Sequence, residues 1–233
     1  MVAVTKRLPF LGLLVLALAA WWISDHTITP WIQRLAGYDQ IHDKALSILL
    51  GHWVFGQLPR VVLCVAVWLM GARFGLMPSL RQSLGSGMSW RKVVVTGLIA
   101  TAIGLVLTFA IAVAAGGAFG FHPYVPKMAG DLVSNLYEEI VYRGLFFCSF
   151  FGVAAGTRFL LSGPLDRAGL IVGTIGSCFV FALGHEQYEM SLRIAIGVLA
   201  IVLVYPWAAA RSLWASWIPH TLGDFITDSI VTL

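Results

Sequence analysis

Long apolar runs separated by short polar stretches dominate this chain. Each run approaches the ~20 residues that a helix needs to cross the hydrocarbon core of a bilayer. The polar positions fall mainly between the runs, so the pattern predicts an all-α, polytopic transmembrane helical bundle. We place seven spans at residues 8–23, 58–76, 93–121, 132–155, 168–185, 191–210 and 213–232.

Two segments leave the number and the start of the spans open. Residues 45–56 are apolar but short for a span, and they fit an interfacial or re-entrant helix. If this segment also crosses, the chain has eight spans and every later orientation reverses. The first span follows Lys6 and Arg7 and has features of a cleaved signal peptide, whereas Trp21 and Trp22 favour a retained helix with an interfacial anchor.

Composition supports a chain that has lipid as its solvent. Hydrophobic residues make up 59% of the sequence and charged residues 11%, whereas a soluble domain carries about 25% charged residues. The formal net charge is +4, but the basic residues lie between apolar runs, which is the positive-inside pattern and not a nucleic-acid-binding face. We expect no nucleic-acid partner. The cysteines have no paired spacing, and we expect them to be buried as small hydrophobic residues: Cys64, Cys148 and Cys178.

The chain shows no linker or internal repeat, so residues 1–233 read as one membrane domain. With seven spans, the basic loops share one side of the membrane, which the positive-inside rule assigns to the cytoplasm. The amino terminus then lies inside and the carboxyl terminus outside. We expect a multi-pass protein of the plasma (inner) membrane.

A cluster of ionisable residues lies on the predicted span 132–155. A charge at the bilayer centre costs at least ~2.5–3.5 kcal/mol and is rarely retained without a use. Glu139 and Arg143 are four residues apart and share one helical face as an ion pair, while Glu138 lies about 100° around the helix, without a basic partner. A lone Glu–Arg pair often only joins two helices, but a second adjacent Glu is expensive for that purpose.

Two further clusters occupy later spans. His185 ends the run that begins at Phe179, and His220 and Asp224 share a face of the last span. Each cluster alone has an ordinary structural explanation, namely an interfacial His and a His–Asp pair. Together, ionisable groups on separate apolar helices are tolerated best if they converge on one polar cavity. Such a cavity suits hydrolysis, because a buried Glu can take a proton from water while His orients it or stabilises an oxyanion.

These clusters follow an ordered pattern, EExxxR, then FxxxH, then HxxxD: Glu138, Glu139 and Arg143; Phe181 and His185; His220 and Asp224. In this pattern the chain resembles the CPBP family of CAAX-protease-like membrane proteins, which includes prenyl endopeptidases and bacterial relatives. The resemblance covers roughly residues 130–230, a CPBP-like catalytic core, and residues 1–125 match only as generic membrane helices.

The resemblance implies a glutamate-type intramembrane endopeptidase. In the family scheme, Glu138 activates the attacking water with help from His185. His220 and the residue at Asp224 stabilise the oxyanion, and Glu139 and Arg143 hold the site together. One position departs from the better-studied prenyl endopeptidases, which have Asn where this chain has Asp224. Because an ionised Asp would repel an oxyanion, Asp224 is either protonated or orients His220.

The resemblance leaves the cofactor, the substrate and the activity itself to be tested. Two His and a Glu could ligate Zn²⁺, but the chain lacks an HExxH motif, and we expect no metal cofactor. We expect the substrate to be a membrane-anchored protein or peptide precursor, such as one with a C-terminal sorting or anchor segment, because Glu138 and His185 fall toward the outer side in the seven-span arrangement. The competing classes are a non-catalytic membrane scaffold and a small transporter that use the same cavity.

Overall fold

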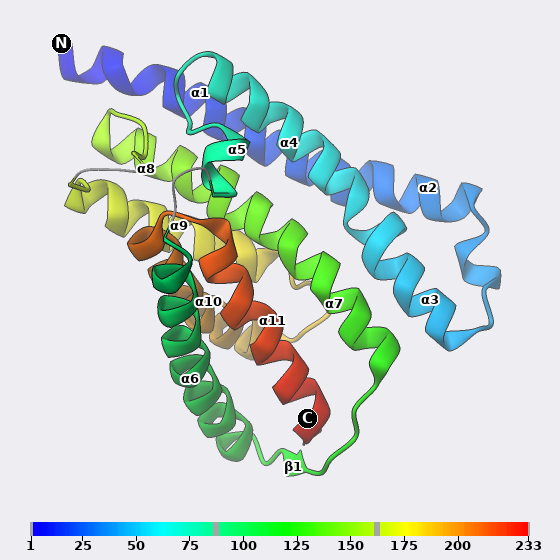
Figure 1. Cartoon of the computed structure of the whole chain (residues 1–233). Helices are drawn as coiled ribbons and strands as arrows, with labels where there is room; N and C mark the ends of the chain where they lie inside the picture. Colours follow the sequence, from blue (N-terminus) through cyan, green and yellow to red (C-terminus); the bar gives the residue numbers. More distant parts are fainter. Residues whose placement is uncertain (1, 86–88, 161–163, 233) are drawn as a thin grey trace.

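The computed structural model describes residues 2–85, 89–160 and 164–232. These residues form a bundle of helices with one short antiparallel strand pair, β1 (Ala118–Phe119) with β2 (Val231–Thr232). The predicted all-α class is therefore confirmed, and Figure 1 shows how the helices cross.

The first two arms of the bundle are long interrupted helices that run antiparallel (Figure 1). The first arm comprises α1 (Val2–Ile23), the π-helical η1 (Ser24–Ile28) and α2 (Thr29–Leu35). After the 3₁₀ turn η2 (Tyr38–Gln40), the second arm comprises α3 (Lys44–Leu50), the π-helical η3 (Gly51–Gly56) and α4 (Leu58–Arg73). Residues 24–57, which lie between the first two predicted spans, are thus largely helical. The reversal falls at Gly37, whose φ of 61° suits glycine.

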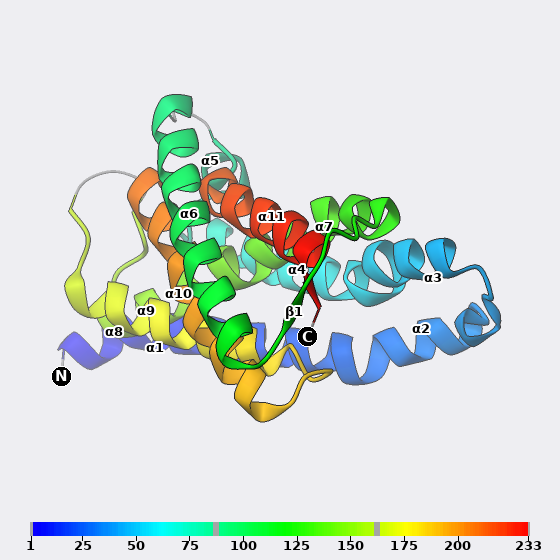
Figure 2. The same cartoon turned by 90° about the horizontal axis from the view of Figure 1, so that it is seen from below.

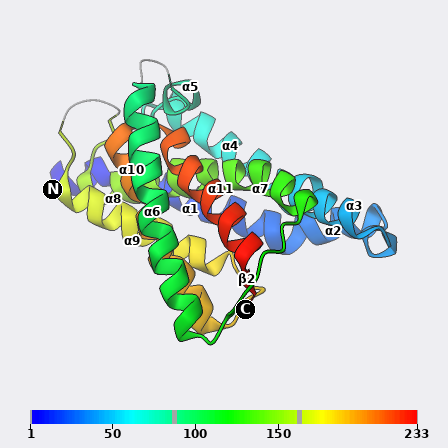
Figure 3. The ribbon, with the colours of Figure 1, turned by 60° about the horizontal axis from the view of Figure 1, so that its bottom comes forward.

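The remaining helices begin with α5 (Leu80–Ser83) and α6 (Trp90–Ala114). The predicted span 93–121 is too long, because α6 ends before Gly116, which has a φ of 73°, and the chain then enters β1. Figure 3 shows the loop after α6 passing beside the carboxyl-terminal end of α11. The helices that complete the bundle are α7 (Val125–Glu138), the π-helical η4 (Glu139–Phe146), α8 (Phe147–Ala155), α9 (Arg167–Leu183), α10 (Met190–Ala210) and α11 (Leu213–Ile230).

The central element is the continuous run of α7, η4 and α8, in which every residue of η4 is buried. Gly144 lies against the ring of Trp68 on α4, and Gly152 lies against Phe10 on α1, so a side chain at either position would collide with an aromatic ring. Small residues permit such close helix contacts in membrane proteins. The predicted span 132–155 is therefore the buried axis around which the other helices pack. The three cysteines are buried, as expected from the sequence.

Not every helix of the bundle has the length and hydropathy of a membrane span. Among the described residues, those that do are Lys6–Leu35, Lys44–Arg73, Trp90–Ala114 and Met190–Ala210, and Arg167–Leu183 is apolar but shorter. Figure 2 shows α6 and α10 crossing the first two arms steeply. The central run and α11 carry the ionisable residues described below, which lowers their hydropathy. The count of seven or eight spans stays a prediction.

Candidate active site

The paired glutamates lie where α7 gives way to η4. Glu138 is the last residue of α7, and its side chain is 13% exposed. Glu139 and Arg143 are fully enclosed, at 0% and 1% exposure, and Arg143 Nε lies 3.5 Å from Glu139 Oε2. The guanidinium also lies over the ring of Phe181, with its Cζ 4.4 Å from the ring centroid. One carboxylate is thus buried beside a cation, while its neighbour reaches the edge of the site.

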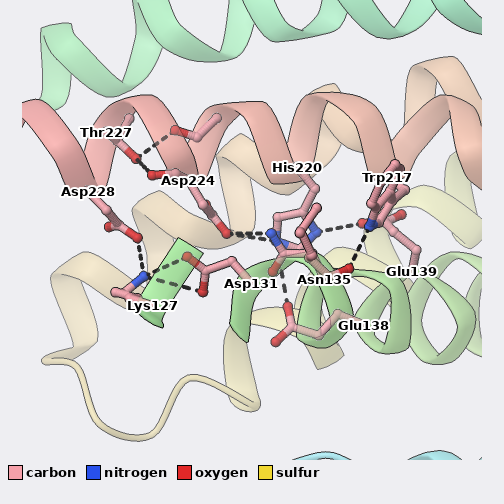
Figure 4. A network of polar contacts seen from close by, with 12 residues as sticks. Lys127, Asp131, Asn135, Glu138, Glu139, Trp217, His220, Asp224, Thr227 and Asp228 are labelled. Atoms are coloured by element: carbon pink, nitrogen blue, oxygen red, sulfur yellow. Dashed lines mark hydrogen bonds and ion pairs between the residues drawn. The ribbon is translucent and has the colours of Figure 1, made fainter. Parts of the chain in front are cut away.

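His220 on α11 joins both glutamates (Figure 4). Its Nδ1 lies 2.7 Å from Glu139 Oε1, and its Nε2 lies 3.6 Å from Glu138 Oε2. Since an ionised carboxylate only accepts hydrogen bonds, Nδ1 carries a proton and donates to Glu139. The distance of 3.6 Å on the other side exceeds a direct hydrogen bond, so a water molecule that contacts both groups has to sit beside the line that joins them.

Asp224 lies one turn beyond His220 and accepts a hydrogen bond from Asn135, a residue that the sequence pattern did not indicate. Asn135 Nδ2 donates to Asp224 Oδ2 at 2.8 Å, whereas Asp224 Oδ2 is 3.8 Å from His220 Nε2. His220 is therefore oriented by the short hydrogen bond that it donates to Glu139. Asn135 is buried four residues before Glu139 and shares its helical face. That spacing, within a helix already selected for its glutamates, was a signal that could have found it.

The Asn135–Asp224 pair supplies a test of the unusual last motif position. Asp224→Asn keeps an oxygen that can accept from Asn135, and it removes a carboxylate beside His220. We expect peptide turnover to be kept or raised several-fold, because an anion at this position opposes formation of the oxyanion. The measurement is the steady-state rate of the purified variant, with Glu189→Gln as the control for loss of an exposed carboxylate away from the site. A fall of tenfold or more in Asp224→Asn alone would show that the negative charge itself is needed.

His185 follows α9 and its cap Gly184, in the loop that leads to α10. Its Nδ1 lies 2.8 Å from the carbonyl oxygen of Phe181, and its ring centroid is 4.5 Å from that of Phe181. The ring of Phe181 also lies edge-on to His220, at 5.7 Å. Phe181 thus links the two histidines. Within the described residues, His185 is recorded in a hydrogen bond to this backbone oxygen and not to a carboxylate, so its help to Glu138 stays a prediction.

A second polar cluster approaches Glu138 from the two amino-terminal arms. Gln57 Nε2 donates to Glu138 Oε1 at 3.0 Å, and Arg60 Nη1 lies 3.3 Å from Gln57 Oε1. Arg60 also donates to Tyr142 at 3.1 Å and to both carboxylate oxygens of Asp25, at 2.8 and 2.6 Å. None of these residues besides Glu138 belongs to the motifs that predicted the site. Arg60 is nevertheless a charged residue inside the predicted span 58–76, and a charge inside a span is the feature that identified Glu138 and Glu139.

The polar side chains continue along the contact between α7 and α11 to the surface (Figure 4). Lys127 pairs with Asp131, one turn along α7, and with Asp228 on α11. The side chains of Lys127 and Asp228 are each 37% exposed. This strip of polar residues connects the enclosed Glu139 with the exposed end of the two helices.

The expectation that the site uses no metal cofactor stays a prediction. In the parts of the chain that the structure describes, no group of three or more His, Cys, Asp and Glu side chains is arranged to hold a metal ion.

The bundle and this site define an all-helical membrane protein in which glutamate, histidine and arginine side chains meet between the packed helices. Residues 128–226 match the family model described as Type II CAAX prenyl endopeptidase Rce1-like, which confirms the resemblance to the CPBP family over this segment. The family points to an intramembrane endopeptidase of the CAAX type. The matched segment contains Glu138, Glu139 and His220, and it excludes Gln57 and Arg60. No curated protein and no solved structure matches the chain.

Proposed function

We propose that this protein is a glutamate-type intramembrane endopeptidase that hydrolyses a peptide bond of a membrane-anchored protein or peptide. The observation that carries the proposal is the pair Glu138 Oε2 and His220 Nε2, which face each other at 3.6 Å while separate hydrogen bonds hold each group. A water beside this pair, at hydrogen-bond distance from both atoms, would lie within reach of a base and an imidazole. Catalytic groups of this kind work only when their orientation is fixed in advance.

The hydrolytic step follows from this placement. Glu138 accepts a proton from the water, and the hydroxide oxygen forms a bond to the carbonyl carbon of the substrate. The tetrahedral oxyanion accepts a hydrogen bond from Nε2–H of His220 in its doubly protonated imidazolium form, whose positive charge is balanced by Glu139. The carbon–nitrogen bond then breaks, and Glu138 returns its proton to the leaving amine. Arg143 keeps Glu139 charged inside the bundle, and Asn135 restrains Asp224 at the edge of the site.

The polar strip along α7 and α11 supports a substrate that reaches the site from one membrane surface. An extended peptide has backbone groups that need hydrogen-bonding partners or water, and lipid offers neither. The strip from Lys127 to Asp224 supplies polar side chains along the way. A precursor with a C-terminal anchor or sorting segment fits this route, because its anchor stays in the bilayer while the adjoining peptide enters between the helices. We propose the plasma (inner) membrane of a bacterium as the location.

The proposal is tested by comparing the peptide termini of membrane and secreted proteins from cells with the wild type and cells with Glu138→Ala at matched expression. We expect one or a few precursors to remain uncut in the variant, and the lost terminus identifies the cleaved bond. The side chain lost is partly exposed, so the variant is expected to fold.

Glu189→Ala, at the exposed N-cap of α10, is the matched control and should leave all termini unchanged. If Glu138→Ala changes no terminus and restores the phenotype of a deletion strain, the hydrolytic proposal is wrong. A scaffold role would then replace it.

A further inference from the structure

Asp25, Gln57 and Arg60 lie outside the segment that matches the protease family, yet the polar cluster that they form ends on the proposed base. Asp25 belongs to η1, Gln57 lies between η3 and α4, and Tyr142 belongs to η4. Arg60 and Asp25 are largely enclosed, with side-chain exposures of 11% and 15%. Helices η1, η3 and η4 are all π-helical, and π-turns inside α-helices are frequent at functional sites. The π-helical turns of the two arms and of the central run therefore lie at or beside one hydrogen-bonded network.

The direction of each hydrogen bond in this network is fixed by chemistry. A guanidinium only donates, so the Gln57 oxygen must face Arg60 and its amide nitrogen must face Glu138. Arg60 cannot turn away easily, because both oxygens of Asp25 hold it in a bidentate pair at 2.8 and 2.6 Å. The ion pair thus determines which end of the Gln57 amide reaches Glu138.

This arrangement gives the two carboxylate oxygens of Glu138 different partners. Oε1 accepts from Gln57 at 3.0 Å, and Oε2 is the oxygen that faces His220 at 3.6 Å. Without the amide donor, the carboxylate could rotate and lose this alignment. We infer that Gln57 is a positioning residue for the base Glu138, and that Arg60 and Asp25 act through Gln57 by fixing the direction of its amide. This inference rests on the proposed function, which gives Glu138 its role.

Gln57→Leu removes the donor and keeps a side chain of similar size. We expect turnover to fall about tenfold to a hundredfold, as for a lost hydrogen bond to a charged group, with KM changed less than about threefold. The probe is an internally quenched peptide spanning the bond that the Glu138→Ala comparison identifies, assayed with the full-length protein in detergent. The matched control is Gln82→Leu, which removes a glutamine that caps α5 with Ser79. It is expected to lower thermal stability and leave turnover unchanged.

A charge exchange distinguishes positioning from simple stabilisation. Asp25→Arg combined with Arg60→Asp is designed to keep an ion pair between the two arms and to place beside Gln57 a carboxylate, which can only accept a hydrogen bond. The amide must then present its oxygen to Glu138. We expect a turnover loss at least as large as that of Gln57→Leu, with less loss of thermal stability than in the single variant Arg60→Asp. Adding Gln57→Leu to the exchange should lower turnover by less than threefold more, because both changes act through one bond.

Two results would overturn the inference. One is wild-type turnover in Gln57→Leu while Glu138→Ala abolishes cleavage, which would leave the proposed function intact. The other is a Gln57→Leu defect that appears equally in KM and turnover and is matched by Gln82→Leu, which would reduce Gln57 to a structural residue. If Glu138→Ala itself leaves every terminus unchanged, the proposed function fails first and the positioning role falls with it.

Discussion

His220→Ala is expected to lower turnover by about 10²–10⁴-fold, the range for loss of a positioned acid–base group. The reason is that His220 contacts both members of the glutamate pair, with Nδ1 2.7 Å from Glu139 and Nε2 3.6 Å from Glu138. The variant should still fold, because Glu139 keeps Arg143 as a partner when the imidazole is gone. The measurements are the single-turnover rate on the quenched peptide and the thermal unfolding of the purified variant.

The control for His220→Ala is His122→Ala, which truncates an exposed histidine in the loop between α6 and α7. It should retain the wild-type rate. His220→Gln adds a useful comparison, because its amide can still donate to Glu139 but cannot take up a proton at the position of Nε2. If His220→Gln is as active as the wild type, the imidazole serves orientation alone and the oxyanion role in the proposed mechanism is wrong.

The sequence was sufficient to select Glu138, Glu139 and His220 as members of one site. Charged and imidazole groups are rare inside apolar helices, so their presence there is informative without any structure. The structure places Glu139 in a hydrogen bond with His220 and Glu138 3.6 Å from the same ring, and the helix spacing also accounts for the Glu139–Arg143 pair. What spacing along one helix cannot provide is the relative rotation of separate helices, which depends on packing. His185 is the example, because the end of α9 directs it toward Phe181.

The residues that the sequence analysis missed share a physical reason. Gln57 and Glu138 are far apart in the sequence, and they meet because α4 packs against η4 through the close contact of Trp68 with Gly144. Asp25 lies between the predicted spans 8–23 and 58–76, outside both. In the structure, the π-helical η1 continues α1 and brings Asp25 to Arg60. A hydropathy pattern detects where helices lie but not where their turns widen.

The boundaries of the helices were predictable only where a local signal ends them. The predicted span 191–210 lies within α10, which ends at Ala210 just before Arg211 with its φ of 57°. Residues 93–121 include apolar positions beyond the end of α6, because Ala118 and Phe119 belong to β1 and pair with the end of the chain. That pairing is a long-range contact, so neither segment alone predicts it.

Replacing Glu139 with methionine is expected to destabilise the fold by about 3–5 kcal/mol, the usual cost of removing one partner from a buried ion pair. Arg143 is 1% exposed, and among the described residues Glu139 is the carboxylate recorded within ion-pair distance of it. Arg143→Met should cost less, since Glu139 keeps its 2.7 Å contact with His220. The measurement is the free energy of unfolding of each variant in mixed micelles, with the quenched-peptide rate recorded on the same samples.

The double variant Glu139→Met/Arg143→Met separates stability from catalysis. Replacing a buried ion pair by apolar side chains of similar volume is often neutral or stabilising, so most of the loss in Glu139→Met should be recovered. Turnover should not recover, because His220 no longer has the carboxylate that fixes its Nδ1 proton and balances its charge. If the double variant regains both stability and rate, Glu139 holds the helices together without orienting His220. The orientation of the imidazole would then have to come from Glu138 and Asp224, which lie 3.6 and 3.8 Å from Nε2.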